Sequence, residues 1–449
     1  MAQAPPRTSQ QENDPDLTTG MQYLRAGWFD RAEPLFRSAV VRLGERPDIL
    51  HFLAVCLSQR GALAEAEALW RKAVAKDPNE PMLSYNLALV ARRMGRIDEA
   101  TRRFRDTIRR APGHVEARLA LASCYMDLGR FAAGERELIE IVENLGQAMA
   151  KPGGEQLRPL VARTRNMLGY ALYRLGRHPE AIGVLDLALA DVGDDASRLG
   201  QILGDRALAL GGLGQYIEAI AEATRAIELS PQSANLNHVL GFLLVFAGRP
   251  AEAVAPVQKA LELDPTFAPA LKTLALAQAA AGQGDEAVQS LHRALRQNAV
   301  DREAVLQLSN LQIERGEFLD AAHTLEPYLK LVPDDVQALN NQGLALRGQK
   351  QLGEAQKVLK RASRLASDDA FVLTNLGRVL VDLGRASEAK QLHEHALRVL
   401  PGDARLLTHY GICLASLGET DKARETLDSA LATDPNNKEA LEARATLAL

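Results

Sequence analysis

Residues 370–403 read AFVLTNLGRVLVDLGRASEAKQLHEHALRVLPGD, and this pattern returns along the chain in units of 34 residues. Apolar residues fall at i, i+3, i+4 and i+7 both before and after Gly384, which is the spacing of an amphipathic helix. The stretch therefore predicts two helices, A and B, which are joined at Gly384 and followed by Pro401.

Three residue types recur in register, and each has a physical role in a pair of close helices. Glycine can adopt the left-handed conformation that ends helix A, alanine lets helix B approach helix A, and proline cannot continue helix B. Glycine occupies the turn at Gly214, Gly248, Gly282, Gly316, Gly384 and Gly418. Alanine occupies the packing position of seven consecutive units, at Ala219, Ala253, Ala287, Ala321, Ala355, Ala389 and Ala423. Proline follows helix B at Pro231, Pro265, Pro333, Pro401 and Pro435.

Together these markers resemble the tetratricopeptide repeat family, which has Leu-Gly in helix A, Gly at the turn, and Ala, Ala and Pro along helix B. In residues 370–403 the matching positions are Leu376, Gly377, Gly384, Ala389, Ala396 and Pro401. The resemblance implies an all-α fold, a right-handed superhelical α-solenoid of about twelve tandem helix–turn–helix repeats. In this register the repeats begin near Asn13, Pro47, Pro81, Val115, Ala162, Gly200, Ala234, Ala268, Arg302, Val336, Ala370 and Ala404.

The register divides the chain into five segments. We expect a disordered tail at 1–12, four repeats at 13–148, an insertion loop at 149–161, eight repeats at 162–437 and a capping helix at 438–449. The insertion is either a longer turn or a hinge between two solenoid segments. Lys350 replaces the turn glycine of repeat 10 and Gly134 the packing alanine of repeat 4, which predicts less regular units there.

The composition limits the classes of function. The net charge is -4, from 53 basic and 57 acidic residues, and gives no general attraction to nucleic acid or to an anionic membrane. No apolar run of membrane-spanning length occurs, and the polar start lacks the apolar core of a signal peptide. Three widely spaced cysteines indicate reduced thiols. We therefore expect a cytoplasmic, bacterial protein without membrane insertion.

Motifs that carry catalysis are missing from the sequence, which contains no GxxxxGK[ST], HExxH or GxSxG. The nine histidines are scattered, and His393 and His395 stand two residues apart, so they point in different directions on a helix. We expect no enzyme activity, no cofactor and no metal site.

The resemblance also implies which surface binds a partner, since positions 2, 5, 6, 9, 12 and 13 of each repeat line the concave groove of the family. In repeats 3 to 5 these positions hold a basic patch, Arg92, Arg93, Arg163 and Arg174. An acidic peptide or a phosphate-bearing ligand would suit it. The alternative is a solvated face with ion pairs between helices. Nucleic acid is disfavoured because no aromatic residues alternate with the arginines.

Repeats 7 and 8 hold an apolar zone. Val239, Phe242, Val245 and Phe246 occupy groove positions of repeat 7, and Leu276 follows in repeat 8. A helix with a second apolar face binds a partner, packs against its own chain, or joins a second copy in a homo-oligomer.

Repeats 9 to 11 hold an amide-rich zone, with groove positions occupied by Asn310, Asn340, Asn341, Arg347, Asn375 and Arg378. Amides repeated on one face can bond the backbone of an extended peptide without reading its sequence. The zone resembles part of the asparagine ladder of the O-linked sugar transferases within this family.

The sequence thus favours a non-catalytic scaffold that binds a protein or peptide in its concave groove. One alternative is an accessory subunit that recruits substrates to a separate enzyme, such as a glycosyltransferase. Another is a self-assembling structural scaffold.

Overall fold

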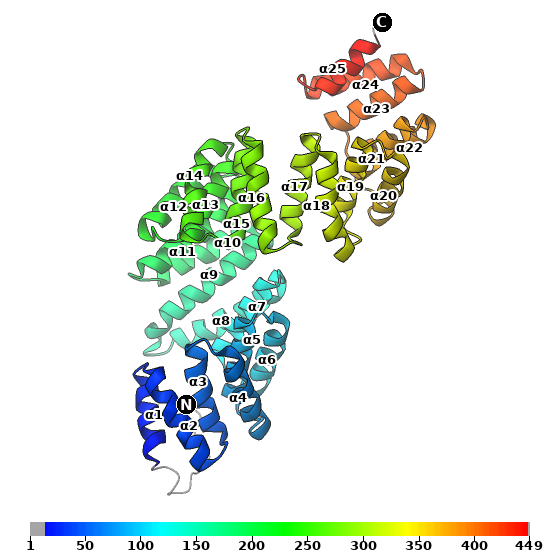
Figure 1. The fold of residues 1–449 in the computed structure, drawn as a ribbon. Helices are drawn as coiled ribbons and strands as arrows, with labels where there is room; N and C mark the ends of the chain where they lie inside the picture. The colour runs from blue at the N-terminus through cyan, green and yellow to red at the C-terminus, as the bar shows by residue number, and fades with distance from the viewer. Residues whose placement is uncertain (1–13, 448–449) are drawn as a thin grey trace. The chain divides into compact units, whose positions relative to one another are not determined.

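The computed structural model describes residues 14–447, and this part of the chain is all α-helical. It contains 25 α-helices, one short 3-10 helix and no β-strand (Figure 1). The predicted all-α fold of tandem helix–turn–helix repeats is confirmed. The expected tail at 1–12 and the last two residues of the expected capping helix lie outside the described residues.

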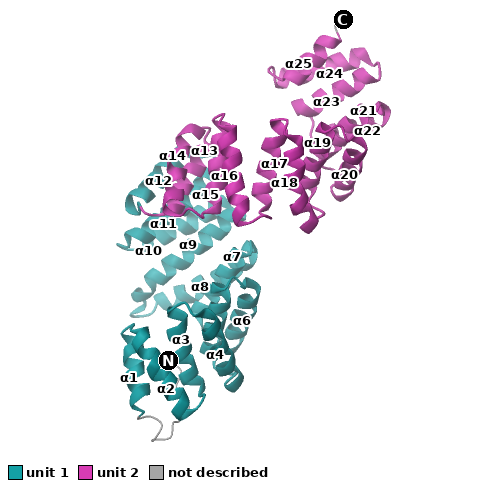
Figure 2. Ribbon diagram, viewed as in Figure 1, with its two compact units in different colours: residues 1–231 teal, residues 232–449 magenta. Residues whose placement is uncertain are grey.

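The helices form two compact units, residues 1–231 and 232–449 (Figure 2). Unit 1 contains α1 (Pro15–Arg25), α2 (Phe29–Leu43), α3 (Pro47–Gln59), α4 (Leu63–Lys76), α5 (Pro81–Arg93), α6 (Ile97–Arg110), α7 (Val115–Asp127), α8 (Phe131–Met149), η1 (Gly154–Leu157), α9 (Arg158–Arg174), α10 (His178–Asp191), α11 (Ala196–Gly212) and α12 (Tyr216–Leu229). Unit 2 contains α13 (Ala234–Phe246), α14 (Pro250–Leu263), α15 (Ala268–Ala280), α16 (Gly284–Gln297), α17 (Arg302–Glu314), α18 (Phe318–Leu331), α19 (Val336–Gly348), α20 (Leu352–Leu365), α21 (Ala370–Asp382), α22 (Ala386–Val399), α23 (Ala404–Ser416), α24 (Thr420–Thr433) and α25 (Lys438–Thr446).

Local hydrogen bonds fix both ends of most A helices, as α21 illustrates. The Asp369 side chain accepts from the backbone N–H groups of Phe371 and Val372 and thereby caps the N-terminus. At the other end Gly384 has φ 75°, and its N–H donates to the Val381 carbonyl at 2.9 Å. This left-handed turn ends α21 and directs the chain into α22.

In several repeats, helix A packs against its own B helix by fitting a glycine against a large side chain. A Cβ added at Gly343 would lie 2.4 Å from Leu359 Cγ, and one added at Gly411 would lie 2.7 Å from Leu427 Cγ. All seven marker alanines of the B helices are fully buried. The close approach expected from the sequence is therefore present, and it depends on small residues, glycine in helix A and alanine in helix B.

The expectation that Lys350 makes repeat 10 less regular is wrong. Lys350 adopts φ 62°, the same left-handed conformation as the turn glycines, and its N–H donates to the Arg347 carbonyl at 2.9 Å. Helices α19 and α20 keep the lengths of their neighbours, 13 and 14 residues. Packing and hydrogen bonds of the turn outweigh the conformational preference of one side chain.

The segment expected to be an insertion loop is largely structured. Helix α8 runs to Met149, η1 follows at 154–157, and α9 begins at Arg158, with Pro159 in its first turn. Val161 is fully buried in a core cluster with Leu138 and Leu168, so α8 and α9 pack within unit 1. The boundary between the compact units instead falls after Pro231.

Gly134, in the packing position of repeat 4, lies in helix α8 with its backbone buried against α7.

No helix within residues 14–447 combines the length and the apolar character that crossing a membrane requires.

Candidate functional site

Unit 2 carries a concave site, called here the asparagine groove, with a volume of about 490 Å³. It is built by four A helices, α17, α19, α21 and α23, which can be followed in Figure 1. Most of its residues occupy positions 2, 5, 6, 9, 12 and 13 of their repeats. The lining is Leu306, Asn310, Ile313, Glu314, Gln337, Asn340, Asn341, Leu344, Asp369, Phe371, Val372, Thr374, Asn375, Arg378, Arg405, Leu406 and His409. The structure thus brings Asn310, Asn341, Asn375 and Arg378 together in one groove.

The amides of this groove are partly bonded to one another across repeats. Asn341 is buried, and its Nδ2 donates to Ser309 Oγ at 3.0 Å and to Asn310 Oδ1 at 2.7 Å. Asn375 Nδ2 donates to Asn340 Oδ1 at 2.9 Å. Both donor hydrogens of Asn341 are therefore used inside the protein. Asn310 and Asn340 act as acceptors in these bonds, which do not use their own NH₂ groups.

The Asn340–Asn375 contact has a counterpart earlier in unit 2. His238 Nε2 lies 3.0 Å from Thr273 Oγ1, and both pairs join position 5 of one repeat to position 6 of the next. Burial lowers the pKa of His238 to about 4, so its ring is neutral. Sequence reasoning missed this contact, although polar residues at these two positions in neighbouring repeats are a readable signal.

Arg378 is the partly buried cation of the asparagine groove. Its side chain is 22% exposed, and its Nη1 lies 3.5 Å from Asn375 Oδ1. Burial, together with the nearby Arg347 guanidinium, lowers the pKa of Arg378 to about 10, so it remains protonated at neutral pH. Arg347 itself is paired with Asp382 at 2.6 Å and is not part of the lining.

Two further residues with nitrogen-bearing side chains line the groove beyond Arg378, and the sequence reading did not select them. The Arg405 guanidinium lies over the Phe371 ring, 4.7 Å from its centroid. Burial, followed by the charge of Arg378, lowers the pKa of His409 to about 2. His409 is therefore neutral and can serve as a hydrogen-bonding group without adding charge.

The apolar zone of repeat 7 is less open than the sequence suggests. Val239 is only 2% exposed, because position 6 faces the neighbouring A helix, so it cannot line an open surface as expected. Phe242, Val245 and Leu276 are partly buried. Phe246 is 53% exposed, and its ring lies 4.6 Å from that of Phe242. Phe246, with the tilted ring of Phe242 beside it, is what remains exposed for a partner to contact.

In unit 1, two arginines of the basic patch are engaged within the protein. Arg92 contacts Asp127 at 2.9 Å and Ser123 Oγ at 2.6 Å. Arg93 donates to the Ser58 carbonyl and hydroxyl at 2.9 and 2.8 Å. These bonds hold the guanidinium groups beside Trp70 in a second concavity.

The other two arginines of the patch are exposed, on α9. The Arg174 guanidinium stacks over Phe131, 4.3 Å from its centroid, and donates to the Tyr170 hydroxyl at 3.0 Å. Arg163 lies exposed near the start of the helix. The four predicted residues therefore do not act as one free cationic surface.

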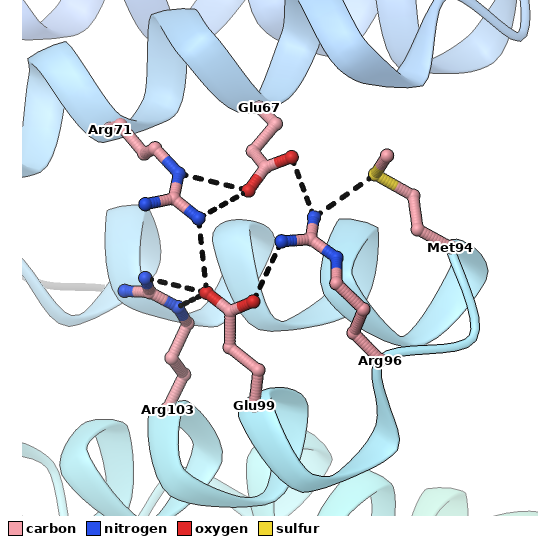
Figure 3. Close-up of polar contacts among 6 residues, drawn as sticks. All are labelled: Glu67, Arg71, Met94, Arg96, Glu99 and Arg103. Carbon is pink, nitrogen blue, oxygen red and sulfur yellow. Dashed lines mark hydrogen bonds and ion pairs between the residues drawn. The ribbon is translucent and has the colours of Figure 1, made fainter.

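Ion pairs between neighbouring B helices account for more of the arginines in this region. In Figure 3, Glu67 and Glu99 lie between three guanidinium groups. The contacts join Glu67 with Arg71 and Arg96 and Glu99 with Arg71, Arg96 and Arg103, at 2.6 to 3.3 Å. Side-chain hydrogen bonds from these arginines hold the pKa values of both carboxyls below their usual range against the opposing effect of burial. The network joins α4 to α6 and serves stability.

Within residues 14–447 no group of three or more His, Cys, Asp or Glu residues is arranged to hold a metal ion. Burial raises the pKa of the Cys56 and Cys413 thiols to about 11 and that of Cys124 above its usual range. All three thiols therefore stay protonated and are poor nucleophiles at neutral pH.

Comparisons with known proteins agree on the repeat. Three family models, each described as tetratricopeptide repeat, match the chain: one at 17–81, 85–144, 142–196 and 205–266, one at 244–304, 278–342 and 380–447, and one at 334–402. A search of curated proteins found no match.

Similar solved structures include the APC/C hetero-tetramer Cut9–Hcn1, at 15% identity, covering 98% of this chain and 96% of that chain, with a TM-score of 0.49. A tetratricopeptide repeat protein from Parabacteroides merdae is 16% identical, covers 56% of this chain and 100% of its own, and has a TM-score of 0.49. Yeast Tom70 is 16% identical, covers 96% and 94%, and has a TM-score of 0.44. With the 34-residue markers in place and family models matching most of its length, the chain belongs to the tetratricopeptide repeat family.

Proposed function

We propose that the chain is a non-catalytic scaffold that binds an extended peptide segment of a partner protein in the asparagine groove. One observation carries the proposal: Asn310 and Asn340, whose NH₂ groups are not used in the bonds between repeats, line a concavity built by four consecutive A helices. An extended peptide presents carbonyl oxygens along its length, and amide donors spaced along a groove match them.

The test selects decapeptides from a random display library on the purified protein. Exchanging both donors, Asn310→Ala with Asn340→Ala, should weaken the selected peptides by roughly tenfold or more, since two hydrogen bonds are lost. Hydrogen exchange should show peptide-dependent protection in α17, α19 and α21. Gln297→Ala with Gln391→Ala removes two exposed amides of B helices and serves as the control. Equal loss of binding in both variants, or protection elsewhere, would contradict the assignment.

Self-association is the second candidate function, favoured by the exposed Phe246 ring, which packs against the ring of Phe242. An apolar surface of this kind can join two copies of one chain. Light scattering across a concentration series should then give a mass above one chain, and Phe246→Ser should return it to the monomer. A wild-type protein that is monomeric at every concentration removes this candidate.

A further inference from the structure

The B helices of repeats 9 to 11 end in exposed apolar side chains. Leu331, Leu365 and Val399 are the last residues of α18, α20 and α22, and they are 69%, 46% and 45% exposed. Val332 and Leu400, which directly follow α18 and α22, are exposed as well. These five residues, called here the edge ladder, lie at the turns between repeats and do not line the asparagine groove.

Polar contacts between neighbouring repeats hold these helix ends next to one another. Arg361 of α20 contacts Asp334, on the turn that follows α18, at 2.7 Å. His395 of α22 lies 2.9 Å from Asp368, on the turn that follows α20. The ladder residues of successive repeats therefore follow one another along one edge of unit 2, at the ends of helices that can be found in Figure 1.

The edge ladder differs from the same positions in other repeats. In repeat 7 the last residue of helix B, Leu263, is partly buried and stands between two acids, Glu262 and Asp264. Repeats 8 and 12 have polar residues at this position, Gln297 and Thr433. In repeats 9 to 11 a basic residue precedes the ladder position and an apolar residue follows it, in the triplets Lys330-Leu331-Val332, Arg364-Leu365-Ala366 and Arg398-Val399-Leu400. The repeat therefore forms equally well without the ladder, which is a local feature of three units.

The basic residues beside the edge ladder have few internal partners. Within residues 14–447, Arg364 and Arg398 are exposed and form no ion pair, and Lys330 pairs only with Glu326 of its own helix, at 2.7 Å. A cation in the last turn suits the helix dipole, and it leaves the charged group in reach of a partner. Exposed apolar surface beside uncompensated positive charge favours a partner that is both apolar and acidic.

We propose that the edge ladder binds an acidic, amphipathic segment of a partner protein. Apolar side chains of the segment cover Leu331, Leu365 and Val399, and its carboxylates lie beside Arg364 and Arg398. Removal of the ladder from water supplies most of the affinity, and the charges select among apolar segments. The site is separate from the asparagine groove, so the chain can hold a segment at each of them.

The charges of this edge disfavour other occupants. In a two-fold contact centred on repeat 10, Arg364 would meet Arg364 of a second copy, and like charges at such a contact repel. An anionic membrane would meet the exposed carboxylates of Asp334 and Asp368 as well as the arginines. A membrane surface cannot place its charges selectively, whereas a protein segment can.

The test selects random segments of about 18 residues, five turns of a helix, from a display library on the purified full chain. Wild-type protein should enrich segments that combine Leu, Ile, Val or Phe with Asp or Glu. A synthetic selected segment should bind the double variant Leu331→Ser, Leu365→Ser roughly tenfold or more weakly. Ile217→Ser, which changes an apolar side chain of α12 that is 89% exposed, should bind it as the wild type does. Circular dichroism checks that each variant keeps its helices.

A second pair of variants tests the charges. Arg364→Gln with Arg398→Gln should weaken the segment several-fold, and the difference from the wild type should shrink when NaCl is raised from about 0.05 M to about 0.5 M, since salt screens exposed charges. Arg102→Gln with Arg136→Gln removes the same charge from exposed positions of α6 and α8 and should have no effect. With Asn and Gln in place of its Asp and Glu, the segment should bind the wild type and the Arg364→Gln, Arg398→Gln variant equally.

Failure at the edge ladder is distinguishable from failure at the groove. Asn310→Ala with Asn340→Ala should leave the affinity for the segment unchanged, and hydrogen exchange should show protection at the ends of α18, α20 and α22. The proposal is overturned if no selected segment depends on Leu331 and Leu365, or if acidic and neutral forms bind equally well. A dimer in light scattering that Leu331→Ser with Leu365→Ser dissolves would assign the ladder to a second copy. Sedimentation with phosphatidylserine vesicles that the same variant loses would assign it to a membrane, and either result overturns the partner segment.

Discussion

In several repeats of this protein, a single glycine decides how closely helices A and B approach. Gly343 faces the fully buried Leu359, and a Cβ at that position would lie 2.4 Å from Cγ, well inside van der Waals contact. Since both backbones are held by their own helices, neither side of the contact can move freely.

We expect Gly343→Ala to lower the free energy of unfolding by about 1–3 kcal/mol through overpacking, measured as a lower denaturant midpoint. Gly183, inside α10, has nothing within 4 Å of its Cβ site, so Gly183→Ala should instead add about 0.5–1 kcal/mol. Combining Gly343→Ala with Leu359→Ala should cost less than the sum of the two changes. Additive losses would show that the two residues do not clash.

His393 is a second residue whose environment predicts a measurable effect. It is 1% exposed, and neither ring nitrogen has a hydrogen-bond partner. It faces Gly377 at the position where the neighbouring repeats have Leu359 and Leu427 facing a glycine. Burial, followed by the charge of Arg378, lowers its pKa to about 4. The folded state therefore favours the neutral ring. Its contribution to stability is complete above about pH 6.5 and is lost as the pH falls toward 4.

His393→Leu should raise stability at neutral pH by about 1–2 kcal/mol, because an unpaired polar ring is replaced by an apolar side chain. Between pH 6.5 and 4 the gain should grow, and thermal melting across this range measures it. His395, two residues away, is partly exposed and paired with Asp368 at 2.9 Å, so His395→Gln is the control. A gain independent of pH would show that His393 is not held neutral.

At the scale of the element, the turn between α19 and α20 keeps the left-handed conformation of the other turns although a lysine occupies the glycine position. Lys350 has φ 62°, which costs a side chain with a Cβ about 1–2 kcal/mol and costs glycine little. We expect Lys350→Gly to raise the denaturant midpoint and Gly384→Lys, the reverse change in the next repeat, to lower it by a similar amount. A lower denaturant midpoint for Lys350→Gly would mean that the Lys350 side chain has a stabilising role of its own.

The capping helix α25 offers a test of how far the loss of one helix destabilises the repeats next to it. It covers Leu427 and Ala430 of α24, and its N-cap Asn437 also donates to Thr408 Oγ1 at 3.2 Å. Ending the chain at Asp434 should speed hydrogen exchange in α23 and α24 and leave α13 to α16 unchanged, since a repeat contacts only its neighbours. Asn437→Ala should act in the same place with a smaller effect. Faster exchange throughout unit 2 would contradict local coupling.

The elements could be predicted from the sequence far better than the site. Gly384 and Ala389 act within one repeat, so a period in the sequence is sufficient to place them. The Asn341 bonds to Ser309 and Asn310 depend on which side-chain rotamers meet between repeats. The spacing of residues in the sequence does not contain this information. Glu439 reaches Arg378 from another element 61 residues away, outside the 34-residue register. The pattern therefore identified the groove positions without showing which of them are free.

At the scale of the whole molecule, the two compact units each carry their own core. The cluster around Leu138 and Leu168 lies in unit 1, and those around Leu271 and Leu339 lie in unit 2. We expect residues 1–231 and 232–449, produced separately, to fold with helical contents that add to that of the whole chain by circular dichroism. A fragment that stays unfolded would show that its stability depends on the other unit.

The fit of Gly343 to Leu359 has a consequence for how such a chain gains or loses repeats during evolution. Both members of the contact belong to one repeat, and so do Gly411 and Leu427. A gene segment that encodes 34 residues therefore carries a complete interlocking pair with it when it is duplicated, deleted or moved. An added or lost repeat therefore brings or removes a complete internal contact, and only its contacts with the two flanking repeats have to be matched anew.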